Sequence, residues 1–290
     1  MGTTVRNVLM KFPGRETIEG AGVRLRRSFS NGEVRLLDPF LLLDSFGSDN
    51  PADYRAGFPW HPHRGIETIT YMLEGSVEHG DTLGNRGTIG SGDLQWMRSG
   101  GGIIHQEMPQ VKEGELRGFQ LWLNMPARSK RDPPSYQDVR SSRIPLSRGN
   151  EGQEVRVVAG TYDGVEGPIH TPITGPEYLD INLPDGVTLS HPVPGKRTVF
   201  VHGISGTASF GEDAMQLQRG ETLLFGDGGA VSARAGPGGA RFLLVSGVPL
   251  REPIAWYGPI VMNSESEIAT AIQDLRRGTF LQHREALIKD

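Results

Sequence analysis

Between Phe40 and Asn124 the chain alternates short apolar stretches with turns that contain glycine. Stretches such as Thr68–Leu73 and Phe119–Leu123, bounded by such turns, are typical of β-strands. The composition agrees, because 40 glycines and 20 prolines would punctuate the chain and weaken helix interiors. This alternation of apolar stretches and turns therefore predicts an all-β fold of many short strands.

The rhythm stops at Met125–Asn150, where prolines and arginines accumulate. We interpret this segment as a crossing between two domains, with its charges on a solvated face. Apolar stretches then resume, and they are the expected strands of the second half: Val155–Val158, Tyr178–Leu183, Thr198–His202, Thr222–Phe225 and Phe242–Val245.

A faint internal repeat predicts that the two halves are similar. When Gly75 is laid over Gly206, the expected strands on their N-terminal sides correspond. When Gly92 is laid over Gly220, two further turns correspond, and each leads into a strand. Two copies of one β module are the simplest explanation. We therefore expect one β-barrel domain over residues 1–130 and a second over residues 131–290.

One helix is expected near the C-terminus. Ser264 and Glu267 have the spacing of a capping box, and Gly278 has the position of a C-terminal stop. The apolar residues between them recur at helical spacing, so the helix is expected to pack across a barrel.

Composition excludes several classes of site. The chain has no cysteine, so disulfides, thiolate metal sites and cysteine nucleophiles are ruled out, and a metal would be held by nitrogen and oxygen. The formal net charge of -4 gives no field that would attract nucleic acid, and we expect no direct nucleic-acid binding. No apolar run has the length of a signal peptide or a membrane span, so we expect a cytoplasmic protein without membrane contact.

Two short motifs carry the candidate chemistry. His61 and His63 are two residues apart, and so are His105 and Glu107. In a strand, residues two apart point to the same face, so two such pairs on neighbouring strands can converge on one point. Either pair alone is common by chance, but together they predict a metal site with three imidazoles and one carboxylate. This donor set suits Fe(II), Mn(II), Ni(II), Cu(II) or Zn(II).

The spacing leaves one alternative open. Glu67 follows His63 by four residues and could bind the metal in place of Glu107, or accept a hydrogen bond behind the histidines. Arg64 could pair with Glu67 or lie at the surface. The remaining histidines lack ligand spacing, and we assign them structural or surface roles: His79, His170, His191, His202 and His283.

The repeat also predicts that the second barrel binds no metal. The positions that correspond to the two histidine-containing pairs are occupied by Pro192 and Pro194, and by Ala233 and Ala235. Neither proline nor alanine has a side-chain ligand atom. The second half is therefore expected to support the first or to serve as an interaction surface.

The motifs closely resemble those of the pirin family, a branch of the cupin superfamily. The resemblance covers most of the chain and is carried by four runs: HPHRGIET (61–68), GDLQWM (92–97), GIIHQEMP (102–109) and PLREPIAWYGP (249–259). It implies a bicupin, two jelly-roll β-barrels with a short C-terminal helix. It also implies one iron site in the first barrel, at His61, His63, His105 and Glu107, and it favours Glu107 over Glu67 as the fourth ligand.

The resemblance also implies a function. Several family members are quercetin 2,3-dioxygenases, which open a flavonol ring with dioxygen and release carbon monoxide. By that analogy we expect Fe(II) as the metal, and a flavonoid and dioxygen as substrates. Glu107, or Glu67 if it faces the cavity, is the expected catalytic base. Other members are regulators, so the alternatives are a binding protein whose metal site modulates a protein partner, and a cupin whose metal is purely structural.

Overall fold

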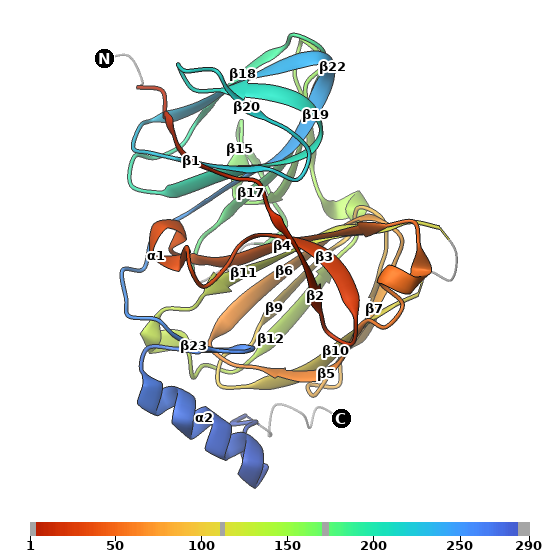
Figure 1. Cartoon of the computed structure of the whole chain (residues 1–290), viewed down its shortest axis with the longest axis vertical. Coiled ribbons are helices and arrows are strands. Elements are labelled where there is room, and N and C mark those ends of the chain that lie inside the picture. The colour runs from red at the N-terminus through yellow and green to blue at the C-terminus, as the bar shows by residue number, and fades with distance from the viewer. Residues whose placement is uncertain (1–3, 111–113, 170–173, 284–290) are drawn as a thin grey trace. The chain divides into compact units, whose positions relative to one another are not determined.

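The computed structural model describes residues 4–110, 114–169 and 174–283, which are predominantly β-strand and form two compact units (Figure 1). We call them the N-half unit (Glu16–Gly32, Phe40–Ser141 and Leu250–Asp290) and the C-half unit (Met1–Arg15, Glu33–Pro39 and Ser142–Pro249). The units differ from a simple division at residue 130, because each includes segments from the other end of the chain. The all-β fold class predicted from the sequence is confirmed.

The N-half unit contains two antiparallel sheets. In the larger sheet, β6 (Ile66–Glu74) pairs with β9 (Leu94–Arg98) on one side and with β11 (Leu116–Asn124) on the other. Its remaining strands are β2 (Arg15–Glu19), β3 (Val23–Phe29), β4 (Phe40–Ser48) and β12 (Ser135–Val139). The smaller sheet has the order β5 (Phe58–His63), β10 (Ile103–Pro109), β7 (Val77–Asp81) and β8 (Arg86–Ile89).

Apolar side chains from both sheets form a shared core in the N-half unit. Phe46 and Met72 of the larger sheet belong to the same buried cluster as Val77 and Ile89 of the smaller sheet. Burial of such side chains contributes roughly 1.5–3 kcal/mol each. The two sheets are thereby held face to face. The short 3₁₀ turns η1 (Pro51–Asp53) and η2 (Ala127–Ser129) connect strands of this unit.

The C-half unit is built on one large antiparallel sheet. Its centre is β19 (Thr198–Phe210) paired with β22 (Ala230–Gly247). The other strands are β1 (Val8–Phe12), β13 (Leu146–Arg148), β14 (Glu154–Ala159), β17 (Glu177–Leu183), β18 (Thr188–Pro192), β20 (Met215–Leu217) and β21 (Thr222–Phe225). The ribbon of β15 (Thr161–Tyr162) and β16 (Val165–Glu166) and the helix α1 (Val34–Leu37) also belong to this unit. The 3₁₀ turn η3 (Ser141–Arg143) contains the boundary between the two units in the sequence.

The internal repeat corresponds to equivalent backbone hydrogen bonds. In the N-half unit the amide of Gly92 donates to the carbonyl of Met72 at 2.9 Å, and the amide of Met72 donates to the carbonyl of Asp93 at 3.0 Å. In the C-half unit the amide of Gly220 donates to the carbonyl of Gly203 at 2.9 Å, and the amide of Gly203 donates to the carbonyl of Glu221 at 3.0 Å. The positive φ of both turn glycines, 79° and 78°, explains the residue type. The predicted similarity of the two modules is confirmed at these turns.

The interpretation of Met125–Asn150 as a solvated crossing is wrong in part. β12 forms an edge of the larger N-half sheet, and β13 pairs with β14 in the C-half unit. Lys130, read as part of a solvated charged run, is 1% exposed. Its ammonium donates to the carbonyls of Gly65 and Val261 and to Asn124, which compensates for the loss of water.

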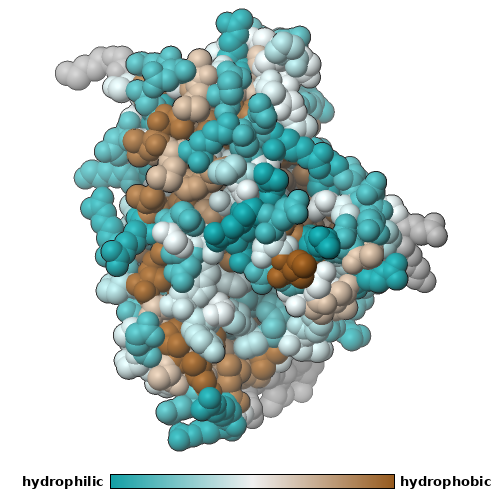
Figure 2. Space-filling view, in the orientation of Figure 1, coloured by the Kyte–Doolittle hydropathy of each residue, from teal (hydrophilic) through white to brown (hydrophobic). Residues whose placement is uncertain are grey.

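The predicted C-terminal helix is confirmed. Helix α2 (Glu265–Arg277) begins after Ser264, whose side chain accepts the amide of Glu267, and ends at Gly278 with φ of 69°. Its apolar face packs in the N-half unit against the hairpin of β23 (Ala255–Tyr257) and β24 (Ile260–Met262). Among the described residues, neither α1 nor α2 has the length and apolar character to span a bilayer. Hydrophilic residues dominate the face shown in Figure 2, with hydrophobic residues in smaller patches.

Candidate metal centre

Strands β5 and β10 place three histidines together. The strands pair antiparallel, with His61 opposite His105 and Ile103 opposite His63. Directly opposite residues share a face, as do residues two apart in one strand. The candidate ligand atoms of His61, His63 and His105 accordingly lie within 4.8 Å of one another. The predicted convergence of these three side chains is what the structure shows.

The rings of His61 and His63 are oriented by backbone carbonyls. Nδ1 of His61 lies 2.8 Å from the carbonyl oxygen of Pro59, and Nδ1 of His63 lies 3.1 Å from that of Pro259. A carbonyl can only accept a hydrogen bond, so each Nδ1 carries the proton and, in the neutral ring, each Nε2 carries a lone pair. The two Nε2 atoms are 3.0 Å apart. Two lone pairs this close repel, whereas a cation beside them would be bound by both.

His105 supplies a third unsatisfied nitrogen. Its side chain is 0% exposed, and its Nε2 has no hydrogen-bond partner among the described residues. Burial lowers the pKa of His105 well below its usual value, and burial likewise lowers the pKa of His63. Both rings are therefore neutral near pH 7, and each keeps a nitrogen lone pair that can bind a metal. A buried orphan nitrogen next to two facing lone pairs fits a divalent ion that accepts imidazole ligands.

Glu107 lies close to this cluster and is held by neighbouring side chains. It follows His105 on β10 and, with His61 and His63, lines one cavity. Its Oε1 accepts from the hydroxyl of Thr70 at 3.2 Å, and its Oε2 accepts from the amide of Gln120 at 3.4 Å. The described residues whose ligand atoms lie within 4.8 Å of one another are the three histidines, without Glu107. Its part in metal binding remains a prediction.

Glu67 faces away from the cavity. It lies on β6 three residues before Thr70, and residues an odd number apart in a strand point to opposite faces. Thr70 lines the cavity, whereas Glu67 does not. The alternative in which Glu67 replaces Glu107 therefore finds no support in the geometry. Arg64 pairs with Asp274 at 2.8 Å and is 2% exposed, so it is not a surface charge.

The cavity beside the histidines has a volume of about 640 Å³. Four aromatic side chains line it, namely Phe46, Phe58, Trp122 and Trp256. Its one lining arginine, Arg27, is bound to Asp44 at 2.8 and 2.7 Å and to Glu19 at 2.8 Å, so its charge is balanced. Such walls favour a flat apolar ligand with a few polar groups.

His79, for which the sequence predicts a structural or surface role, is buried beside the cluster. Its Nδ1 lies 3.5 Å from Nδ1 of His105, a proximity that the sequence analysis does not predict. The available signal was the spacing of His79 and Asp81, which puts both side chains on one face of β7. His191 and His202 are buried with polar partners, in line with structural roles. His283 contacts the carbonyl of Arg131, and His170 lies outside the described residues.

The positions in the C-half unit that match the histidines have no donors. Ala233 and Ala235 are 2% and 3% exposed and belong to the apolar core of that unit. Pro192 lies at the exposed end of β18. The absence of metal from this unit remains a prediction, tested below.

Comparison with known proteins gives the family. The pattern of the Pirin domain matches residues 22–123, and that of the Pirin C-terminal cupin domain matches residues 178–281. The chain is 43% identical over 277 residues to a pirin-like protein of Caulobacter vibrioides, covering 95% of this chain and 99% of the relative. It is 43% identical over 281 residues to a Pseudomonas aeruginosa protein that carries a provisional quercetin 2,3-dioxygenase name, covering 95% and 98%.

A solved structure gives the same result. The quercetin 2,3-dioxygenase of Acinetobacter baumannii superposes with a TM-score of 0.88 at 33% identity, covering 95% of this chain and 98% of that one. With the two β units described above, these matches confirm the predicted bicupin fold. This chain belongs to the pirin family.

Proposed function

We propose that this protein is a metal-dependent dioxygenase that opens flavonols such as quercetin at the 2,3-bond. The metal would be held by His61, His63, His105 and Glu107. One observation carries the proposal: three imidazoles, two of them buried and the third, that of His61, half-buried, converge on one point beside an aromatic-lined cavity. The names of the Pseudomonas and Acinetobacter proteins support an oxidoreductase of this type.

Iron is the metal we propose. The donors are nitrogen and oxygen alone, which suits several first-row divalent ions, and Mn, Ni, Cu or Zn could bind the same set. A divalent ion bound there supplies a Lewis acid, which lowers the pKa of a coordinated hydroxyl group. Three neutral imidazoles and one carboxylate leave such a site with a charge near +1, which favours an anionic ligand.

The side chains of the chain itself would position the substrate and take its proton. The cavity walls at Trp122 and Trp256 hold a flat ring system and exclude water. The carboxylate of Glu107 is the base that accepts the flavonol 3-hydroxyl proton, at Oε1 or Oε2. Thr70 and Gln120 hold this carboxylate in place through the hydrogen bonds at 3.2 and 3.4 Å.

Oxygen uptake tests the proposal. Protein loaded with Fe(II) under anaerobic conditions is mixed with quercetin and air-saturated buffer. We expect oxygen consumption with carbon monoxide release, and a loss of at least about 100-fold in His61→Ala and His105→Ala. His283→Ala removes a histidine outside the cluster and is the matched control, expected to keep parental activity. Parental activity in His61→Ala shows that the assigned site is wrong.

A variant at Glu107 separates its two roles. Glu107→Gln keeps the size of the side chain and one acceptor oxygen but removes its charge and its basicity. We expect a large loss of kcat with a smaller loss of metal affinity, because the three histidines remain. Equal losses of both would assign Glu107 to metal binding alone.

A second candidate function is a binding module that acts through a protein partner. Trp60, next to His61 on β5, is 53% exposed, and exposed aromatic residues are enriched at protein interfaces. A metal-loaded protein that consumes no oxygen with any of a panel of flavonoids would favour this function.

A further inference from the structure

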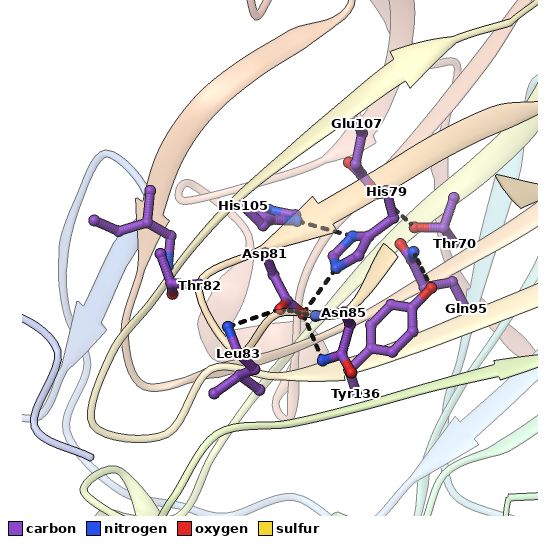
Figure 3. A network of polar contacts seen from close by, with 11 residues as sticks. Thr70, His79, Asp81, Thr82, Leu83, Asn85, Gln95, His105, Glu107 and Tyr136 are labelled. Atoms are coloured by element: carbon purple, nitrogen blue, oxygen red, sulfur yellow. Dashed lines mark hydrogen bonds and ion pairs between the residues drawn. The ribbon is translucent and has the colours of Figure 1, made fainter. Parts of the chain in front are cut away.

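A histidine outside the cluster, His79, lies behind the candidate ligand His105. His79 lies on β7, which pairs with β10 so that His79 is opposite Glu107, and Asp81 is opposite His105. Directly opposite residues share a face, so all four side chains point the same way. Figure 3 shows the resulting chain of contacts from His105 to His79 and on to Asp81. His79 is 0% exposed, so water does not replace these contacts.

Asp81 is a fixed acceptor at the end of this chain. Its Oδ1 accepts the amides of Leu83 and Asn85 at 2.8 and 3.0 Å, and its Oδ2 accepts the side-chain amide of Asn85 at 2.9 Å. Burial would raise the pKa of the Asp81 carboxyl, but the hydrogen bonds from His79 and Asn85 outweigh burial and bring the pKa below its usual value. Asp81 is therefore ionised and can only accept hydrogen bonds.

The acceptor at Asp81 determines where the ring protons lie. Nε2 of His79 is 3.0 Å from Oδ2 of Asp81, so this nitrogen carries the proton of the neutral ring. Nδ1 of His79 is then an acceptor, and it faces Nδ1 of His105 at 3.5 Å. Nδ1 of His105 must in turn be the protonated nitrogen. The lone pair of His105 is left on Nε2, the buried atom that has no partner among the described residues.

We propose that His79 and Asp81 are positioning residues that hold His105 in the tautomer and orientation needed to bind a metal through Nε2. The inference rests on the metal-ligand role of His105 proposed above. It assigns each of the three histidines its own acceptor behind the ring: a backbone carbonyl for His61 and for His63, and the His79–Asp81 pair for His105. Loss of such an acceptor typically weakens metal binding by about 10- to 100-fold.

Tyr136 provides a matched control. Its ring stacks on His79 at a centroid distance of 4.3 Å and an interplanar angle of 20°, which holds the imidazole plane. Its hydroxyl accepts from Gln95 at 3.2 Å and takes no part in the contacts between His79 and His105. Tyr136→Phe therefore keeps the stacking and leaves the proposed chain of hydrogen bonds unchanged.

The test measures metal binding, with Zn(II) titrated into metal-free protein against a chromophoric chelator. We expect His79→Phe to raise the Kd by about 10- to 100-fold and Asp81→Asn to raise it by a smaller factor. Tyr136→Phe is expected to stay within about twofold of the parent. Cu(II)-loaded His79→Phe should also show an altered electron paramagnetic resonance spectrum, because His105 is free to rotate. Asp81→Asn retains the shape of the side chain and keeps the test decisive if His79→Phe does not fold.

Two other outcomes are informative. If His79→Phe and Asp81→Asn lower the melting temperature of the metal-free protein while the Kd and the Cu(II) spectrum stay parental, the pair is structural only and the proposal is overturned. His105→Ala tests the underlying site separately. Parental zinc binding in His105→Ala would mean that the assigned metal site itself is wrong, whereas lost binding there with parental His79→Phe rejects the positioning role alone.

Discussion

The Nε2 atoms of His61 and His63 lie 3.0 Å apart, while both rings direct Nδ1 to a backbone carbonyl. The two carbonyls come from distant parts of the chain: Pro59 precedes His61 by two residues, and Pro259 follows His63 by 196. The C-terminal segment thus takes part in presenting a candidate ligand. The contact of His63 with Pro259 is one of those that join the C-terminal segment to the N-half unit.

Metal removal is expected to lower stability. A metal that binds the folded protein but not the unfolded chain stabilises the fold by RT ln(1 + [L]/Kd), or about 2.7 kcal/mol at 100 times the Kd. We expect Zn(II) or Fe(II) at that excess to raise the melting temperature of chelator-treated protein by roughly 5–10 °C. Scanning calorimetry with and without metal measures the shift. His105→Ala should show no shift, and a metal-independent melting temperature in the parent would contradict the site.

Metal content should be one ion per chain. Four C-half positions match the candidate ligands: Pro192, Pro194, Ala233 and Ala235. The two alanines pack in an apolar core, and none of the four side chains has a ligand atom. The protein is saturated with metal, and unbound metal is removed by gel filtration. Elemental analysis should then give one metal ion per chain in the parent and none in the double variant that combines His61→Ala with His105→Ala. A residual equivalent in the double variant would place a second site elsewhere.

The sequence predicts the convergence of the three candidate ligand histidines because strand alternation is a local rule. The two-residue spacings of His61 and His63, and of His105 and Glu107, are enough to place each pair on one face. Which strand lies beside them is a non-local property. His79 and Pro259 approach the site only through the pairing of β7 with β10 and through the position of the β23–β24 hairpin, and no short motif encodes either.

The fold shows the same contrast: local features can be predicted from the sequence, and non-local pairings cannot. The turns at Gly92 and Gly220 are recognisable in the sequence because a left-handed backbone favours glycine. The exchange of terminal segments between the units is invisible to that repeat, because β1 and the C-terminal hairpin lie outside it. Lys130 was misread for a related reason: its three acceptors, Gly65, Asn124 and Val261, are assembled by tertiary structure.

Lys130 is expected to stabilise the N-half unit by tying three chain segments together. At pH 9, above the lowered pKa of Lys130 of about 7, this side chain is a neutral amine with two N–H groups. Lys130→Met would therefore leave two of the three acceptors without a donor, at a cost of about 1–3 kcal/mol for each group that stays buried. We therefore expect the variant to be less stable at pH 9 by at least about 2 kcal/mol. Urea unfolding of metal-free protein measures the difference.

The same residue should make stability depend on pH. Burial lowers the pKa of Lys130 to about 7, below its unfolded value of about 10.4. Between these values the unfolded chain holds a proton that the folded protein has released, so stability rises with pH, by at most about 1.4 kcal/mol per unit. The stability gap between the parent and Lys130→Met should therefore widen from pH 7 to pH 9. Lys196→Met, which removes an exposed ammonium, is the control variant.

Asp274 is expected to stabilise the packing of helix α2 in the N-half unit through its ion pair with Arg64. Arg64, 2% exposed, donates to Asp274 at 2.8 Å and to the carbonyl of Phe280 at 2.7 Å, and its guanidinium lies 4.3 Å from the centroid of the Phe280 ring. Asp274→Ala removes the counter-ion of this buried cation and should cost about 2 kcal/mol, below the 3–5 kcal/mol of a fully buried pair because Asp274 is partly exposed. Asp274→Asn keeps one acceptor and should cost less. Hydrogen exchange in residues 265–277 should speed up in the order parent, Asn, Ala; equal exchange in all three would contradict the role.

Gly65 is expected not to tolerate a side chain. The reason is the close approach of Val261 as well as the positive φ of Gly65. Gly65 and Gly84 have nearly equal φ, 80° and 83°, but a Cβ on Gly65 would lie 2.0 Å from the carbonyl oxygen of Val261, whereas one on Gly84 meets nothing within 4 Å. Gly84→Ala should therefore cost only the left-handed strain, about 1–2 kcal/mol. Gly65→Ala must in addition displace β24 and break the 3.0 Å hydrogen bond from the amide of Val261 to the carbonyl of Arg64, for a total of about 3–4 kcal/mol.

Because β24 follows Pro259, which orients His63, we also expect weaker zinc binding in Gly65→Ala and parental binding in Gly84→Ala. Urea unfolding and zinc titration of both variants measure these effects, and equal costs at the two glycines would show that the close approach of Val261 is not limiting.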